Sequence, residues 1–453
     1  MNKYMRSGTK SIQEQFFNKF SDIRFLVFII MVALFIDMEV SNEAHLFYKD
    51  ISTEIGVIVF VLISSIYLVS QQYVLSYSTK EQEQTGVGRS SFGIIRKITN
   101  IMIFFVTVCF LTLIIEILIP KYYDTFLLLL ILAASNAIAM IAMSDMSSKF
   151  FTWYHNRKQL AILIFGTMAL TLSITAFVTI VFMGMVLMDQ PEKVNADTVV
   201  SLPIIDQCSF LALLNYIYYY LAVFSYVITW VMTTLLLKDY KIKVGKFKYL
   251  FVLSLPLIFY LSQLLVTQLG LFIPEDAAGN LNFQVWFLFF YTPSSLVGGI
   301  LFSVPFFLII RKLDATNPLK NFLRITAYGL ILFFAAGSAT VYHTPYPPFG
   351  LLTVAAIGPS AYLIALGVYY SARIISSNRT IEIQLKRSSQ YSQFFANIGS
   401  AEMEKTMTEI VEEIRKKLPP DEGKTVSDLE VVDREIMEYL KEFQARKRSR
   451  NNP

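Results

Sequence analysis

Long uncharged apolar runs, separated by short polar segments, dominate the chain. A bilayer core about 30 Å thick is crossed by roughly 20 helical residues, so runs of that length bounded by charge, Pro or Gly predict membrane-spanning helices. Such runs occur at approximately 22–40, 54–76, 100–120, 125–144, 160–188, 210–237, 250–273, 285–310, 323–341 and 351–372. The pattern therefore predicts an all-α fold, a polytopic transmembrane helix bundle of about ten spans.

The distribution of Lys and Arg indicates the direction of these spans independently, because cytoplasmic segments next to a membrane are enriched in both residues. With the N-terminus inside, the N-terminal segment and the inner loops hold twenty-one basic residues, and the outer loops hold only Lys49, Lys121 and Lys193. A miscount of one span would invert this alternation downstream. The sequence thus predicts a cytoplasmic segment at 1–24, a ten-span transmembrane domain at 25–372 and a cytoplasmic helical tail at 373–453.

The tail is charged enough to lie in water, and its local signals predict three helices. Gly399-Ser400 is typical of a helix stop followed by a new N-cap, and Pro419-Pro420 ends the helix after it. The last helix has one apolar face, which must be buried because a short amphipathic helix is marginal in water. That face consists of Leu429, Val432, Ile436, Leu440 and Phe443. We expect it to contact a cytoplasmic protein partner, another copy of the tail, or the inner leaflet.

Composition supports a membrane protein and offers little for catalysis. Apolar residues make up 55% of the chain and charged residues 16%, against about 25% charged in soluble domains. The chain lacks the phosphate-binding, kinase and dinucleotide-binding motifs, and its two cysteines and three histidines have no metal-ligand spacing. We therefore expect the lipid bilayer as a partner, no cofactor, no bound metal and no nucleic acid, and the sequence leans against an enzyme.

Four acidic residues lie toward the outer ends of predicted spans: Asp37, Glu39, Glu54 and Glu116. A carboxylate within a bilayer is costly and by default marks a functional-site hypothesis. Asp37 follows Arg24 by about 20 Å along a helix that rises 1.5 Å per residue, which places it below the external interface. Two interpretations remain open. The four acids form a cation or proton site, or they are separate interfacial carboxylates that reach headgroups and water.

Helix-breaking residues cluster in the second half of the chain. They are Pro256, Pro293, Gly298, Gly299, Pro305, Gly358 and Pro359. Transporters use discontinuous helices of this kind to bind substrates, because unwound backbone is tolerated where protein or a water-filled cavity satisfies it. Static kinks are the alternative interpretation, since Pro and Gly are common in membrane helices.

Two further patterns suggest packing more than ligand binding. Thr167, Thr171, Thr175 and Thr179 recur at four-residue spacing in the fifth span, which predicts a helix-packing seam, with a polar pathway as the alternative. The sixth span carries five tyrosines, which predict an aromatic belt or a lipid-facing surface, with a ligand cage as the alternative. The tyrosines are Tyr216, Tyr218, Tyr219, Tyr220 and Tyr226.

The stretch from Tyr342 to Ala372, YHTPYPPFGLLTVAAIGPSAYLIALGVYYSA, resembles uncharacterised archaeal multi-pass membrane proteins. The PYPPFG loop and the helix from SAYL to YYSA carry this resemblance, which covers roughly the last third of the chain. It implies location in an archaeal plasma membrane and implies no activity.

Together these features predict a membrane-embedded sensor or scaffold, because the last span runs into a charged helical tail without an obvious breaker. Movement of that span would reach the tail directly. The alternative is a secondary transporter that uses broken helices and the outer-leaflet acids.

Overall fold

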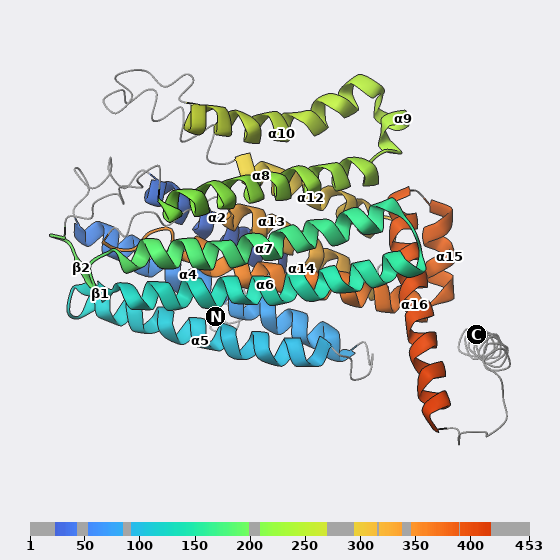
Figure 1. Cartoon of the computed structure of the whole chain (residues 1–453), viewed down its shortest axis with the longest axis horizontal. Coiled ribbons are helices and arrows are strands. Elements are labelled where there is room, and N and C mark those ends of the chain that lie inside the picture. The colour runs from blue at the N-terminus through green and yellow to red at the C-terminus, as the bar shows by residue number, and fades with distance from the viewer. Residues whose placement is uncertain are drawn as a thin grey trace, which may run out of the picture.

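The computed structural model describes residues 23–42, 53–84, 92–198, 209–269, 294–314, 317–337, 346–388 and 390–417. Within them the chain forms a helix bundle (Figure 1). The helices are α2 (Ile23–Asn42), α4 (Thr53–Gln84), α5 (Phe92–Leu118), α6 (Thr125–Asn156), α7 (Leu160–Met188), α8 (Phe210–Leu236), α9 (Tyr240–Val244), α10 (Lys246–Leu269), α12 (Ser294–Ile310), α13 (Leu319–Ala336), α14 (Leu351–Ser377), α15 (Arg379–Ser388) and α16 (Gln390–Lys417). The strands are β1 (Tyr122–Asp124) and β2 (Lys193–Asn195). The predicted all-α class is confirmed.

Seven of the described helices are long and apolar enough to cross a membrane, namely α4, α5, α6, α7, α8, α13 and α14. They coincide with seven of the predicted spans. Helices α2 and α10 lie where the spans at 22–40 and 250–273 were predicted, and α12 is a shorter apolar helix within 285–310. The structure thus supports a helical membrane protein, while the count of ten spans stays a prediction.

The outer faces of several helices are apolar, as expected for contact with lipid. Phe104 and Ile119 in and after α5 are 70% and 76% exposed, and Ile58 of α4 is 63% exposed. Soluble proteins rarely expose contiguous apolar surface of this kind. Because helices satisfy their own backbone groups, they can present such faces to hydrocarbon.

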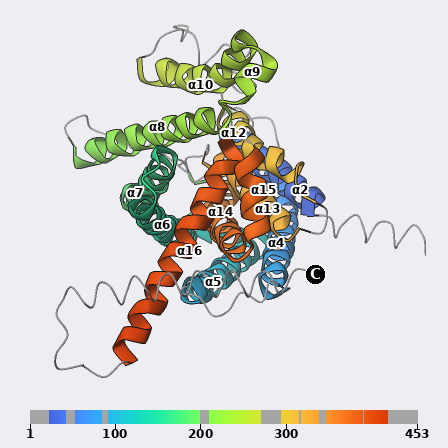
Figure 2. The same cartoon turned by 90° about the vertical axis from the view of Figure 1, so that its right-hand side faces the viewer.

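Helix α14 is the centre of the bundle. Figure 2, which views the bundle along its axis, shows α14 among α4, α6 and α13. Nearly all of its side chains are buried, including Leu352, Ile364 and Ile375. Its sequence is rich in Gly, Ala and Ser, which allow neighbouring helices to approach closely.

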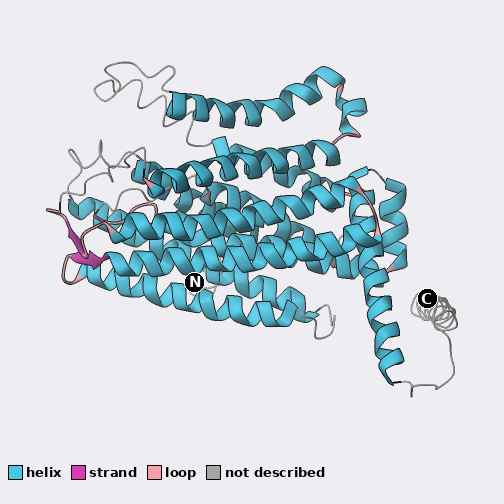
Figure 3. Ribbon diagram, in the orientation of Figure 1, coloured by secondary structure: helices cyan, strands magenta, loops and turns pink. Residues whose placement is uncertain are grey.

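Two short strands close one end of the bundle, which we call the strand end (Figure 3). Strands β1 and β2 pair antiparallel, with Tyr123 opposite Val194. Asp124 caps α6 by accepting a hydrogen bond from the backbone N–H of Phe126 at 2.8 Å. The strands therefore tie the connection between α5 and α6 to the segment that follows α7.

The opposite end, which we call the tail end, carries α15 and α16, and α16 crosses the bundle axis steeply (Figures 1 and 2). Helix α16 is continuous through Gly399 and Ser400, so the predicted helix stop there is wrong. Gly399 is required for close packing, since a Cβ atom added to it would lie 2.3 Å from Cγ2 of Ile375 in α14. The Ser400 hydroxyl donates to the Glu382 carboxylate of α15 at 2.7 Å. The predicted last helix and its face of Leu429, Val432, Ile436, Leu440 and Phe443 lie outside the described residues.

Candidate functional site

Asp37 joins α2 to the beginning of α14 through a buried polar contact. One of its carboxylate oxygens accepts the backbone N–H of Gly350 at 2.9 Å. The other accepts the backbone N–H and the hydroxyl of Thr353 at 3.0 and 2.8 Å. These N–H groups have no acceptor within α14, because they lie at its first turn, and a negative side chain also complements the helix dipole there. The structure thus places Asp37 as the cap of α14, with its side chain fully buried.

The structure does not bring the other three predicted acids to Asp37 as a metal-binding group. Glu116 accepts the backbone N–H of Asp124 at 3.1 Å and so closes the turn between α5 and β1. Glu54 is exposed in the first turn of α4, and Glu39 is half-buried two residues beyond Asp37. The described part of the chain has no cluster of three His, Cys, Asp or Glu side chains that could hold a metal ion. A shared cation or proton site stays a prediction.

The predicted helix breaks fall within continuous helices wherever they are described. Helix α10 runs through Pro256, α12 through Gly298, Gly299 and Pro305, and α14 through Gly358 and Pro359. Pro293 lies outside the described residues. The chain is therefore not unwound at the six described positions, contrary to the expectation of discontinuous helices. At Pro359 a neighbouring side chain explains how the helix tolerates proline.

Ser135 of α6 forms hydrogen bonds with backbone groups of α14 next to this proline. The nitrogen of Pro359 cannot donate to the Ala355 carbonyl one turn earlier. The Ser135 hydroxyl lies 3.1 Å from that carbonyl oxygen and 2.8 Å from the Val354 carbonyl oxygen, to which it can donate. It also accepts the backbone N–H of Gly358 at 3.0 Å. An inserted side chain of this kind both satisfies freed backbone groups and couples two helices.

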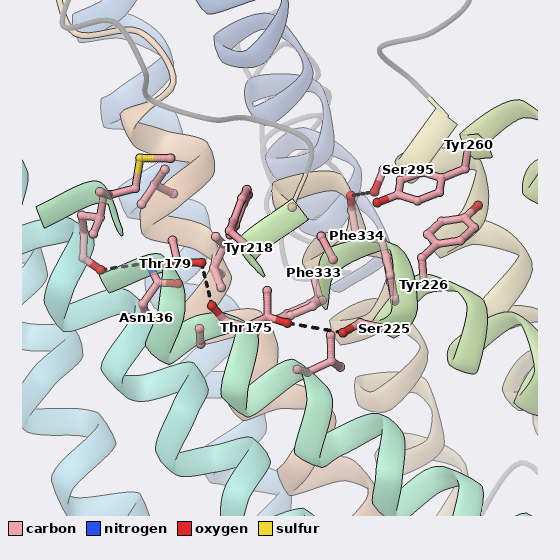
Figure 4. A pocket seen from close by; sticks show the side chains of 18 residues that line it. Asn136, Thr175, Thr179, Tyr218, Ser225, Tyr226, Tyr260, Ser295, Phe333 and Phe334 are labelled. Atoms are coloured by element: carbon pink, nitrogen blue, oxygen red, sulfur yellow. Dashed lines mark hydrogen bonds between the residues drawn. The ribbon is translucent and has the colours of Figure 1, made fainter. Parts of the chain in front are cut away.

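A cavity of about 90 Å³ lies between α6, α7, α8, α10, α12, α13 and α14, in the half of the bundle toward the strand end (Figure 4). Aromatic rings, small apolar side chains and hydroxyl groups form its wall. The aromatic residues are Tyr218, Tyr226, Tyr260, Phe333 and Phe334. None of the described residues that line it is an Asp, Glu, Lys or Arg. The cavity is thus neutral and aromatic, and it is partly open.

Tyr226 organises one wall of this cavity. Its ring stacks on that of Tyr260 with centroids 3.8 Å apart and planes 7° apart, and the Phe334 ring lies edge-on at 5.9 Å. Its hydroxyl donates to the carbonyl oxygen of Pro256 in α10 at 3.2 Å. A Cβ atom at Gly298 of α12 would lie 2.3 Å from the Tyr226 hydroxyl oxygen, so glycine is needed for this ring to fit. Two of the predicted helix breakers therefore hold Tyr226 in place.

The hydroxyls around the cavity are oriented by bonds to backbone carbonyls. Thr175 and Thr179 each donate to the carbonyl four residues earlier at 2.8 Å, and Ser225 does the same at 2.7 Å. Ser295 of α12 donates to the Phe334 carbonyl of α13 at 2.7 Å. A hydroxyl has one hydrogen, so these oxygens retain lone pairs that can only accept hydrogen bonds.

Sequence reasoning identified several of these residues but assigned most of them to packing. Thr175 and Thr179 belong to the threonine stripe, and both line the cavity. Tyr218 and Tyr226 belong to the tyrosine-rich span, yet they line the cavity, whereas Tyr216 and Tyr220 of the same span are exposed. Asn136 was missed, although a buried amide within an apolar span is a signal that sequence reasoning can use.

Helix α16 is attached to the tail end of α6 by specific polar contacts. The indole N–H of Trp153 donates to the Glu402 carboxylate at 2.8 Å, and both side chains are buried. Arg157 forms an ion pair with Glu404 at 2.5 Å. The first of these contacts carries more weight, because exposed ion pairs contribute little. The predicted tail is therefore docked on the bundle over its described part.

Comparison of the chain with models of protein families, with curated proteins and with solved structures finds no match. The cavity, the central helix and the docked tail are therefore the observations on which a function can rest.

Proposed function

We propose that this protein is a membrane-embedded sensor whose helical tail reports the state of the cavity. The observation that carries the proposal is the position of α14. This one helix lines the cavity with Val354 and Ile357 and contacts Gly399 of α16 with Ile375. The two contacts are about 30 Å apart at a rise of 1.5 Å per residue.

Three contacts hold α14 along its length, so a displacement near the cavity cannot be absorbed locally. Asp37 fixes its first turn, and Ser135 fixes it at the proline. Toward the tail end, the Lys149 ammonium of α6 lies 4.4 Å from the centre of the Tyr369 ring. Close-packed interiors transmit strain and switch between discrete packings. We propose that a ligand in the cavity favours one packing of α14 against α6, and that α16 follows.

The proposed output is cytoplasmic. The alternation of Lys and Arg supports a tail end inside the cell, and the resemblance to archaeal proteins would imply the plasma membrane. Helices α15 and α16 would then present the response to a protein partner or to a second copy. The apolar face predicted from Leu429 to Phe443 would supply the contact.

The proposed orientation predicts opposite accessibility for a position in the last turns of α4 and a position in β2. Single cysteines at Lys80 and Lys193, in a chain without Cys109 and Cys208, are expected to react with a membrane-impermeant thiol reagent from the inside and the outside respectively. Labelling before and after permeabilisation of intact cells measures this. Reaction of position 193 only after permeabilisation would reverse the assignment of the two ends.

The proposed coupling predicts that filling the cavity moves α16. Ala176 lines the cavity and is 5% exposed, so Ala176→Leu adds three carbon atoms to its interior. We expect the distance between spin labels at Ile94 of α5 and Thr408 of α16, both exposed, to change in this variant. Electron double resonance in nanodiscs measures the distance distribution.

The matched control is Val69→Leu, because Val69 is 56% exposed on α4, away from the cavity. It should leave the distance distribution unchanged. If Ala176→Leu folds and also leaves the distribution unchanged, α14 does not connect the cavity to α16 and the sensor proposal fails.

A secondary transporter is the second candidate, favoured by the interrupted hydrogen-bond ladder of α14 beside the cavity. Transport requires the cavity to open alternately to both sides of the membrane. A solute taken up by proteoliposomes, with uptake reduced by Ala176→Leu, would favour this candidate over the sensor.

A further inference from the structure

We propose that the cavity binds a small uncharged molecule with an apolar body and a hydroxyl or N–H donor. This inference names the ligand class for the sensor proposed above, and so its biological meaning rests on that function. The physical argument does not depend on that function, because it uses only the hydrogen-bond donors and acceptors of the residues that line the cavity.

The wall is rich in acceptors. The hydroxyls of Thr175, Thr179 and Ser225 are each placed to donate to a backbone carbonyl, and the Thr175 and Ser225 oxygens also lie 3.4 Å apart, where either can donate to the other (Figure 4). Each oxygen still keeps a lone pair that can accept a hydrogen bond. Asn136 adds a carboxamide oxygen, since its amide nitrogen donates to the Leu132 carbonyl at 3.0 Å. A ligand group that donates a hydrogen bond finds several partners here. A group that can only accept meets mostly lone pairs on this part of the wall.

Two phenols complete the polar part of the wall. Tyr218 and Tyr260 line the cavity, and no hydrogen bond joins either hydroxyl to another described residue. Each can therefore donate to a ligand hydroxyl or accept from it. A ligand hydroxyl suits this arrangement best, because it can donate to a threonine oxygen and accept from a phenol at the same time.

The apolar residues of the wall determine which charge and which apolar group a ligand can have in this cavity. The faces of aromatic rings carry partial negative charge, which disfavours carboxylates and phosphates. No carboxylate occurs among the described lining residues to pair with a cation, and the attraction of a cation to ring faces offsets only part of the cost of burying it. The ligand is therefore uncharged. The volume of about 90 Å³ is smaller than the roughly 150 Å³ of a cavity that encloses benzene, so a ring-sized body would extend beyond the enclosed space.

Phenol and toluene test this inference on the wild-type chain in nanodiscs, because they differ by a hydroxyl in place of a methyl group. An apolar cavity prefers toluene, since removing a hydroxyl from water costs free energy. We expect the reverse order, with phenol binding about fivefold more tightly through its hydrogen bonds. Benzoate, which carries a negative charge, should not bind. The readout is the saturable rise in the temperature at which half of the protein is lost from its chromatographic peak.

Two variants locate the binding. Ala176→Leu should abolish the effects of both probes, and Tyr260→Phe should weaken the preference for phenol while keeping the ring. Tyr73→Phe is the matched control, because Tyr73 is 60% exposed on α4, and it should behave as wild type. If a variant fails to fold, the relative affinities of phenol and toluene for the wild-type protein still test the inference.

A preference for toluene, binding of benzoate, or effects equal in every variant would overturn the inference. If none of the three probes raises the midpoint, the cavity holds water only, and this result would also overturn the inference. Binding of phenol without a change in the distance between positions 94 and 408 would instead contradict the sensor proposal and leave the ligand class intact. The two proposals can thus fail separately.

Discussion

Replacement of Asp37 by alanine is expected to prevent accumulation of the folded protein. The substitution leaves two backbone N–H groups and one hydroxyl, at Gly350 and Thr353, without their buried acceptor. A single unsatisfied buried donor costs about 1–3 kcal/mol, so the combined loss is of order 3 kcal/mol or more. That is a large part of the marginal stability of a folded chain. The yield of monodisperse protein and its thermal midpoint measure the effect.

Asp37→Asn separates the capping role from the predicted cation or proton site. Asparagine keeps one acceptor oxygen and turns an N–H₂ group toward donors, so a cap should lose a large part of its stability. A cation site predicts the opposite, namely normal yield with altered dependence of function on pH or cations. Glu54→Gln is the control, because Glu54 is exposed in the first turn of α4, and it should leave yield and midpoint unchanged. A normal midpoint for Asp37→Ala would contradict the cap.

The helices could be predicted from the sequence because their signal is local. An uncharged run of about 20 residues has few ways to satisfy its backbone in lipid other than a helix. Each of the seven apolar helices long enough to cross a membrane lies on a predicted span. The same reasoning singled out Asp37 as a costly buried acid. It could not show that the acceptor caps α14, because Gly350 and Thr353 lie more than 300 residues away in the chain.

The errors arose where a local signal had a non-local cause. Gly399 matched a helix stop, yet its lack of a side chain serves the approach of Ile375 from α14. Gly298 matched a helix break, yet it accommodates the hydroxyl of Tyr226 from α8. A sequence shows that a glycine is present but not which neighbour needs the space. The same limit applies to Ser135, whose partners in α14 lie about 220 residues away.

The cavity shows why residue type alone understated function. The threonine stripe does pack in part as expected, because Thr167, Thr175 and Thr179 donate to their own helix. These bonds within α7 leave lone pairs on the oxygens of Thr175 and Thr179, which can accept hydrogen bonds from the cavity. The same hydroxyls thus belong both to a packing seam and to a binding surface. The sequence alone does not show the second role, because it depends on where α8 lies relative to α7.

Replacement of Gly399 by alanine is expected to loosen α16 from the bundle. The new Cβ atom would lie 2.3 Å from Cγ2 and 2.7 Å from Cβ of Ile375, closer than side chains approach in folded proteins. Ile375 is fully buried and cannot turn away into solvent, so α16 must shift. Overpacking of this kind costs about 1–3 kcal/mol. Hydrogen exchange of the backbone amides in 390–417 should become about tenfold faster or more, since opening of α16 determines their exchange.

Gly93→Ala in α5 is the matched control, because a Cβ atom there meets nothing within 4 Å. It should leave exchange in α16 unchanged. Ile375→Ala combined with Gly399→Ala removes Cγ2 and relieves part of the clash, so exchange should return toward the wild-type rate. The bundle should keep its own protection in all three variants, because Asp37 and Ser135 hold α14 independently of the tail. If Gly399→Ala leaves exchange in α16 at the wild-type rate, contact with Ile375 does not hold the tail, and α14 has no direct means of moving it.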